Sequence, residues 1–428
     1  MMMKRILFFF FFCSFSLYAC EKDSLHMTNV VEANNFKDYE STQKEENIGG
    51  KIAVLQRAKK ISTIAWTPLA PIYSHKLNGY FEANHLYEGI PYSSVKQLDK
   101  FVGQEVSFET FVSAVNNPYS VLYTENMGAS PYFGTNCSTY YGSVCSSAIN
   151  YALNIKLPMT TSMYKTSGLF EKISIQNISK AEIGDIILKE NNHVLMVLDV
   201  KTSETNADIL LLESGDEITK EYTLSKSLYE KKFPYADWSI YRYKRINDVE
   251  YDLSEGNNFE KKKTICMSRG DKSCYRLNEK IEVSVLSADY PYMVVENKDS
   301  VICSIKIESK GNVSIPISKP GKYTAYLSHE EFGGEHEEST SFEVIETNVS
   351  CTRSGRYLSV DYSSSNGIPA YIVICKNGKG DRSCVYVITD VDRCLGHVDI
   401  HLSDGSGKYC KVFFQGEYGL VSNVPIEI

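Results

Sequence analysis

The spacing of apolar residues indicates helices and strands in the first half of the chain. Between residues 51 and 243, apolar residues recur every three or four positions in four stretches, which predicts helices over 52–60, 95–101, 107–115 and 163–169. Continuous or alternating apolar runs predict strands over 183–188, 193–200, 207–213 and 238–243. A further helix around residues 142–153 precedes these strands. A helix followed by a short antiparallel meander indicates an α+β fold.

Beyond residue 263 the apolar period becomes two, which is typical of strands. Short strands separated by Gly, Asn, Ser and Pro are predicted over 280–287, 292–296, 301–307, 313–317, 323–328 and 340–345. The same pattern of short apolar runs separated by turn residues continues from residue 350 to residue 428. We therefore predict two all-β, Ig-like sandwich modules, residues 264–346 (module 1) and 347–428 (module 2), after a charged linker.

A faint repeat links the two modules. Residues 265–274 and 374–384 share the order Ile-Cys, a basic residue, Gly-Asp, a basic residue, Ser-Cys. The pattern indicates a duplicated unit and predicts a charged hairpin tip in each copy. The first copy contains Arg269-Gly270-Asp271, which is also open to interpretation as an adhesion tripeptide. Its counterpart Lys379-Gly380-Asp381 favours a simple turn.

The helix that begins near Cys145 places a cysteine in its first turn. Apolar residues lie three, four, seven and eight positions after Cys145, which is one face of a helix. Gly142-Ser143 supplies a turn and an N-cap. Free backbone N–H groups and the positive end of the helix dipole favour a thiolate at this position. A buried structural cysteine is the alternative.

The N-terminus has the pattern of an export signal. A basic pair, Lys4 and Arg5, precedes an apolar run that is too short to span a bilayer. The sequence 17–20 (LYAC) resembles the bacterial lipobox, which implies cleavage before Cys20 and lipid attachment to it. We expect a signal peptide over 1–19, a polar tether over 20–50, and a lipid anchor in a bacterial membrane, facing the periplasm or the cell surface. Ordinary secretion is the alternative.

Composition narrows the classes of partner. A chain of 428 residues is long enough for two to four domains, and thirty tyrosines against two tryptophans suit a β-rich protein. A net charge of -8 gives no reason to expect nucleic acid as a partner. No cysteine pair has CxxC spacing, so we expect neither metal nor cofactor. Export permits disulfides, and Cys266 with Cys274, or Cys375 with Cys384, are close enough in sequence to bracket hairpins.

A cysteine nucleophile needs a base and a group that orients the base. His193 is the candidate base because it opens an apolar strand after a polar turn, in the same predicted domain as Cys145. A solvent-exposed histidine at a strand start is the alternative. Glu213 ends the next strand, so its side chain can lie beside the imidazole across the ladder. Asp199 and Asp216 are rivals for this third role.

Cys137 is the competing nucleophile. It lies eight residues before Cys145 in the sequence Gly-Thr-Asn-Cys-Ser. No amphipathic helix follows it, because residues 139–142 have the pattern of a loop. The helix-dipole argument therefore applies to Cys145 and not to Cys137.

Three motifs in order resemble the NlpC/P60 cysteine peptidases. Residues 142–153 are similar to the helix that carries the nucleophile of that family. Residues 183–187, followed by 192–194, resemble its P-G-D-L…G-H-V sequence, and 89–92 (GIPY) its G-x-P-Y sequence. The resemblance implies a papain-like α+β domain over 51–250, with an N-terminal extension and an insertion. It implies Cys145 as the nucleophile, His193 as the base and a third polar residue, placed at Glu213.

The resemblance also implies a substrate. Enzymes of this family hydrolyse peptidoglycan stem peptides, typically between γ-D-glutamyl and the diamino acid, and Tyr92 and Ser146 are expected in the substrate site. The chain departs from the family pattern at Val144, usually Asp, at Ser147, usually Gly, and at Glu213, usually His, Asn or Gln. Two other hypotheses remain. One is a papain-like amidase or acyltransferase with another substrate, and the other is a non-catalytic surface-binding lipoprotein. The modules would position the enzyme or bind glycan, peptide or protein.

Overall fold

The computed structural model describes residues 48–74, 79–92, 101–124, 141–157, 159–173, 177–203, 206–215, 217–254, 263–334, 336, 338–375, 384–388, 396–402, 405 and 407–428. Every described residue belongs to one compact unit within residues 45–428. The predicted signal peptide, Cys20 and most of the tether lie outside the described residues, as do Cys137 and Asp216.

The described helices are short and lie in the N-terminal region, residues 48–254. They are α1 (Ile48–Thr63), α2 (Phe108–Val115), α3 (Val121–Thr124), α5 (Cys145–Ala152) and α6 (Lys226–Lys232), with 3-10 turns η2 (Ile178–Lys180) and η3 (Ile246–Asp248). The predictions over 52–60 and 107–115 are confirmed. Only the last residue of the predicted helix 95–101 is described, and Phe101 forms a β-bridge with Gly142 instead.

Helix α1 begins earlier than the tether prediction allowed. Residues 48–50 were assigned to the tether because the stretch up to residue 50 is polar and almost free of apolar periodicity, yet they form the first turn of α1. A Cβ at Gly50 would lie 1.9 Å from the carbonyl oxygen of Ile246. The glycine is therefore required by the close approach of η3 and does not mark a linker.

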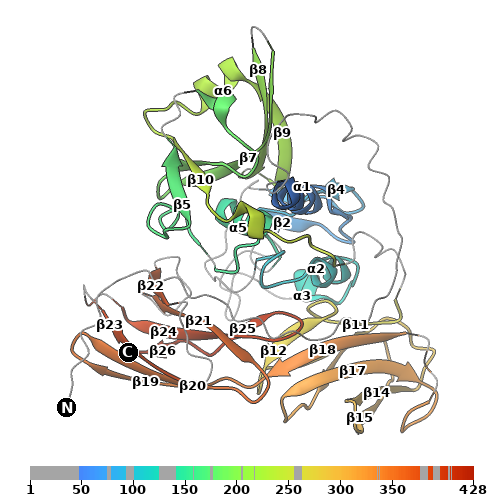
Figure 1. Ribbon diagram of the computed structural model, residues 1–428. Coiled ribbons are helices and arrows are strands. Elements are labelled where there is room, and N and C mark those ends of the chain that lie inside the picture. The colour runs from blue at the N-terminus through green and yellow to red at the C-terminus, as the bar shows by residue number, and fades with distance from the viewer. Residues whose placement is uncertain are drawn as a thin grey trace. The chain divides into compact units, whose positions relative to one another are not determined.

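A six-stranded antiparallel sheet forms the centre of the N-terminal region (Figure 1). Its strand order is β5-β10-β6-β7-β8-β9. The strands are β5 (Phe170–Ile173), β6 (Ile186–Lys189), β7 (His193–Thr202), β8 (Ala207–Ser214), β9 (Thr219–Ser225) and β10 (Ser239–Tyr243). Four of the six were predicted. Four short strands, in two pairs, precede the sheet in the chain: β1 (Ala65–Trp66), β2 (Ile72–Ser74), β3 (Gly79–Phe81) and β4 (Tyr87–Glu88).

Both faces of this sheet are covered, which explains the continuous apolar run in β7. Alternate residues Val194 and Met196 join the core that contains α1 and α5. Leu195 and Val197 join a second core with α6 and η2 on the opposite face. A strand buried on both faces is apolar at every position. Cys145, at the start of α5, and His193, at the start of β7, therefore belong to two elements packed on each other.

One predicted helix is wrong. Residues 161–169 form successive turns, and Ser167 N donates to the carbonyl oxygen of Met163 in the only α-type bond recorded among them. Hydroxyl side chains here bind nearby backbone groups, and Gly168 has φ 73°. These local hydrogen bonds compete with those of a helix, so the apolar spacing that predicted a helix does not produce one.

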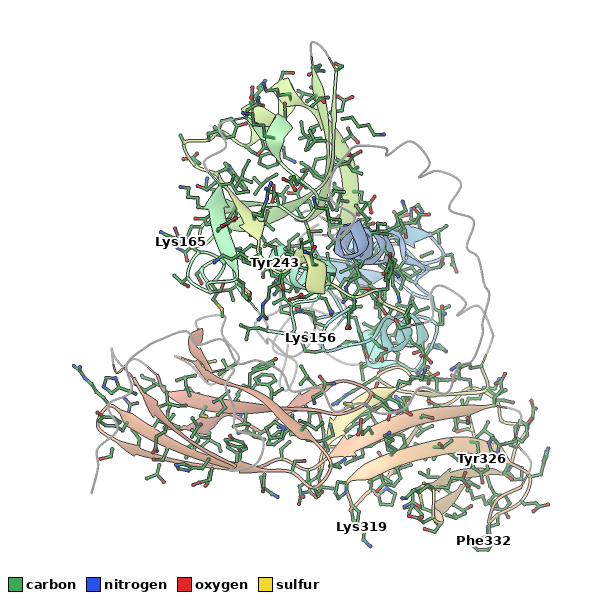
Figure 2. The ribbon with its side chains drawn as sticks, viewed as in Figure 1. Lys156, Lys165, Tyr243, Lys319, Tyr326 and Phe332 are labelled. Carbon is green, nitrogen blue, oxygen red and sulfur yellow. The ribbon has the colours of Figure 1, made fainter. Side chains whose placement is uncertain are left out.

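The two modules are each built from a smaller and a larger sheet. Module 1 contains β11 (Ile265–Met267), β12 (Ser273–Arg276), β13 (Ile281–Val285), β14 (Tyr292–Glu296), β15 (Val301–Lys306), β16 (Gly311–Ile315), β17 (Gly321–Ser328) and β18 (Ser339–Ile345). All six predicted strands are present. The sheets β11-β13-β16 and β12-β18-β17-β14-β15 enclose an apolar core. Figure 2 shows Lys319 and Phe332 pointing outward from this module.

Module 2 repeats this layered arrangement. It contains β19 (Asn348–Ser354), β20 (Tyr357–Ser363), β21 (Ile368–Cys375), β22 (Cys384–Ile388), β23 (His397–His401), β24 (Tyr409–Gln415), β25 (Leu420–Ser422) and β26 (Ile426–Glu427). The sheet β19-β20-β23 faces the sheet β22-β21-β24-β25 across a second apolar core, and β26 pairs with β24. The described chain is therefore mostly β-sheet, as the period of two predicts.

The two copies of the sequence repeat do not occupy equivalent positions in the two modules. Cys375 and Cys384 face each other across the β21–β22 hairpin, as predicted. Cys266 and Cys274 instead lie in β11 and β12, which belong to different sheets, so the first copy is not a hairpin. Cys266 is a free thiol, so it forms no disulfide with Cys274.

The Arg269-Gly270-Asp271 tripeptide is a buried turn. The side chains of Arg269 and Asp271 are 7% and 2% exposed, and Arg269 pairs with Glu279 at 2.7 Å. Asp271 N donates to Ser113 Oγ of α2 at 2.8 Å. The turn docks module 1 onto α2, so the adhesion interpretation is wrong.

Gly270→Ala should destabilise the protein more than Gly355→Ala. Both glycines have positive φ, at 90° and 60°, which costs a non-glycine residue about 1–3 kcal/mol. A Cβ at Gly270 would also lie 2.0 Å from the carbonyl oxygen of Thr110, whereas nothing lies within 4 Å at Gly355. Denaturant unfolding measures both free energies. Equal losses would contradict the tight docking of this turn on α2.

Candidate active site

The first turn of α5 is closed by backbone and hydroxyl bonds around Cys145. Val144 is the N-cap, with φ -113° and ψ 169°, and its backbone N–H donates to Ser147 Oγ at 2.7 Å. The Ser147 hydroxyl thus closes the first turn, at the position where the NlpC/P60 pattern has glycine. The predicted cap, Ser143, is displaced by one residue, and its hydroxyl bonds those of Ser214 and Thr219 instead. Cys145 is the first residue of the helix and is 7% exposed.

His193 joins Cys145 to Glu213. Its Nε2 lies 2.8 Å from Glu213 Oε1, and the Cys145 side chain is close enough to the ring to raise the pKa of His193. Protonated at Nε2, the ring donates to the Glu213 carboxylate. The structure therefore brings together the three side chains that the sequence proposed as nucleophile, base and orienting group. Asp199 lies six residues further along β7.

Glu213 is buried and held in its charged form. Tyr222 of β9 donates its hydroxyl to Oε2, and Lys232 Nζ of α6 lies 3.5 Å from the same oxygen. Burial raises the pKa of Glu213, but bonds from His193 and Tyr222 and the Lys232 charge outweigh it and lower the pKa to about 2. Tyr222 and Lys232 were not predicted as site residues, because β9 and α6 are mostly polar and their sequences do not show which side chains face Glu213.

The same contacts stabilise the imidazolium. Burial lowers the pKa of His193, but the bonds to Cys145 and Glu213 outweigh it and raise the pKa from 6.5 to about 9. His193 therefore carries a proton through neutral pH. A protonated imidazole beside a sulfur can stabilise a thiolate and later give its proton to a leaving group.

Glu213→Gln should move the alkaline limit of activity to lower pH. Activity of the wild type should fall as pH rises through about 9, because deprotonated His193 cannot protonate a leaving amine. Without the carboxylate the pKa of His193 falls, so the limit should move down by roughly one to three pH units. The pH profile of turnover measures the shift. Glu221→Gln on β9, whose carboxylate accepts from Ser62 instead, is the control, and equal profiles for the two variants would contradict the role of Glu213.

A pocket of about 250 Å³ opens beside Cys145. Tyr92 and Ser146, the two residues predicted to bind substrate, both line it. Gln104, Asn150 and the polar stretches 160–162 and 191–192 complete much of the lining and were not predicted. Asn150 lies in α5 and the others lie in separate turns and loops, so no local pattern in the sequence marks them. All the described lining residues are uncharged.

The loop that carries Tyr92 is fixed by backbone bonds. Tyr92 N donates to the carbonyl oxygen of Glu217 at 2.8 Å, and Ser143 N donates to that of Pro91 at 3.0 Å. Gly89 has φ 91°, and a Cβ there would lie 2.0 Å from the carbonyl oxygen of Thr219. The Gly-Ile-Pro-Tyr loop is therefore packed between the start of β9 and the segment that precedes Cys145.

Gly184-Asp185 supports the fold near the site. Gly184 has φ 87°, which favours glycine. Asp185 is 1% exposed and forms a two-bond pair with Arg242 of β10, at 2.9 Å each. This pair fixes the turn that precedes β6 and β7, and so the strand that begins with His193.

Two surveys of the described residues give negative results. Within these ranges, no group of three or more His, Cys, Asp or Glu side chains is arranged to hold a metal ion. Over the same part of the chain, no helix is long and apolar enough to cross a membrane.

Comparison with known proteins gives only partial structural likeness. No family model matches the chain, and no curated protein matches it. The fibronectin(III)-like modules of Clostridium thermocellum CbhA match 38% of this chain and 90% of that chain, with 12% identity and TM-score 0.20. Native alpha-2-macroglobulin from Escherichia coli, domains NIE-MG1, matches 38% and 96%, with 10% identity and TM-score 0.17. At these TM-scores neither match supports an inference about this chain.

Proposed function

We propose that this chain is an NlpC/P60-like cysteine peptidase with a papain-like α+β domain, exported and lipid-anchored at Cys20. Its substrates are peptidoglycan stem peptides, cleaved between γ-D-glutamyl and the diamino acid. The observation that carries the proposal is that Cys145, at a helix start, lies close to His193, which is bonded to Glu213, beside a pocket lined by Tyr92. The order of the three motifs along the sequence supports the same assignment.

The reaction follows from the positions of these groups. The Cys145 thiolate attacks the amide carbonyl carbon, and backbone N–H groups in the first turn of α5 stabilise the oxyanion. His193 gives its proton to the leaving amine as the C–N bond breaks. Water, activated by neutral His193, then hydrolyses the thioester and restores the thiolate–imidazolium pair. Glu213 keeps the ring oriented throughout.

One observation favours a second candidate. The described residues that line the pocket carry no charge, whereas an ordinary stem peptide presents carboxylates. A papain-like amidase or acyltransferase acting on a neutral, polar acyl group would suit this lining. The two candidates share the nucleophile and base and differ in the group that the pocket accepts.

The test compares wild type with Cys145→Ala on two stem peptides. One peptide carries D-glutamate with a free α-carboxylate, and the other carries the same residue with that carboxylate amidated. Mass spectrometry should find two fragments, together heavier than the peptide by one water, only with wild type. Equal products from both proteins would refute the mechanism. Cleavage of the amidated peptide alone would favour a neutral substrate, and cleavage of neither would refute the proposed substrate.

A further inference from the structure

The larger sheet of module 2 is buried on both faces. Along β24, Val412 and Phe414 point into the core of the module, and Phe413 lies on the opposite face. In β21, Ile372 and Ile374 are in the module core, whereas Tyr371 and Val373 share the outer face with Phe413. An outer sheet face normally meets water and alternates with polar residues. This outer face is apolar because it is packed against another part of the chain.

That other part is the candidate active site. The cluster on the outer face contains Val144, the residue immediately before Cys145, together with Phe101, and Tyr92 packs against it. All three also line the pocket beside Cys145. Module 2 therefore shares one apolar cluster with the N-cap of α5 and with Tyr92.

A second contact brings the same surfaces together. A Cβ at Gly419, in the turn between β24 and β25, would lie 2.5 Å from the carbonyl oxygen of Glu105. The carboxylate of Glu105 accepts from Phe101 N at 3.1 Å, which closes the turn that presents Phe101. The backbone of module 2 thus approaches the pocket wall as closely as a glycine permits.

We infer that module 2 is a working part of the catalytic site, with Phe413, Tyr371 and Val373 as positioning residues for Cys145. Val144 has no side-chain oxygen to cap α5, so the packing of its side chain acts together with the Ser147 hydrogen bonds to fix the first turn. A displacement of about 1 Å in a reacting group can cost about a hundredfold in rate. The sheet holds the thiolate against His193 and the N–H groups against the oxyanion. The inference rests on the proposed nucleophilic role of Cys145 and not on the substrate.

Phe413→Leu and Phe414→Leu are a matched pair of variants in the full-length chain. Both side chains are fully buried neighbours in β24, but they face the catalytic region and the module core respectively. Both substitutions should lower the denaturant midpoint similarly. The discriminating readout is the rate of Cys145 alkylation by iodoacetamide across pH, followed by peptide mass spectrometry. Cys303 in module 1, half-buried and far along the chain, is the internal reference.

Phe413→Leu should slow Cys145 alkylation at neutral pH by about tenfold or more, whereas Phe414→Leu should leave it within about twofold. Phe413→Tyr, which keeps the ring, should restore most of the rate. Equal rates in the two leucine variants would overturn the inference. If Phe413→Leu does not fold, Val373→Ala on the same face takes its place, with Ile374→Ala as control. Because no stem peptide enters this assay, a failure of the proposed substrate leaves its result unchanged.

Discussion

His193→Gln should abolish rapid alkylation of Cys145 at neutral pH and lower turnover by about 10³-fold. The imidazolium is the cation beside the sulfur, and its pKa of about 9 keeps it charged through neutral pH. Glutamine retains a hydrogen-bonding group but has no charge and no proton to give. The variant should therefore lose both the cation beside the sulfur and the acid that releases the amine.

The control is His397→Gln in module 2. That histidine also contacts a carboxylate, Asp361 at 2.7 Å, but it is exposed and lies in β23. It should leave alkylation and turnover unchanged. Turnover at the wild-type rate in His193→Gln would show that another group is the base. An unchanged alkylation profile would show that Cys145 is a buried structural cysteine, which was the alternative from the sequence.

The spacing of apolar residues predicted the helices and strands that are buried along one face or along both faces. The strand at 193–200 and the helix at 107–115 were found because their spacing is set by packing alone. Strand β9 and helix α6, whose sequences TKEYTLS and KSLYEKK are mostly polar, were missed. Tyr229 of α6 is nevertheless fully buried. A single aromatic residue in a charged stretch anchors a helix without producing a periodic signal.

The candidate site was predictable for residues of a reactive type that lie at the ends of predicted helices and strands. Cys145, His193 and Glu213 stand at the start or near the end of predicted elements, and the fold brings them within hydrogen-bond contact. Tyr222 and Lys232, which hold Glu213, were not predictable because their contacts depend on how β9 and α6 pack. The pocket lining likewise combines α5 with turns and loops that are distant from it in sequence.

Val144 shows why a departure from a family pattern can have a physical cause. The sequence alone gives no reason for valine where the NlpC/P60 pattern has aspartate. In the structure Val144 is 3% exposed and packed in an apolar cluster with Phe413 and Val373 of module 2. A carboxylate there would face two apolar side chains. The residue before the cysteine and the outer face of module 2 are therefore complementary.

Val144→Asp should destabilise the protein by at least about 3 kcal/mol and abolish the reactivity of Cys145. Burying an unpaired carboxylate forces either protonation or separation of the two surfaces, and both displace the first turn of α5. Val424→Asp makes the same chemical change in module 2 at a side chain that is 64% exposed, so its stability should stay within about 0.5 kcal/mol of wild type. Denaturant unfolding and Cys145 alkylation measure the two effects. Wild-type stability in Val144→Asp would show that the family residue is tolerated there and that module 2 does not seal this side of the site.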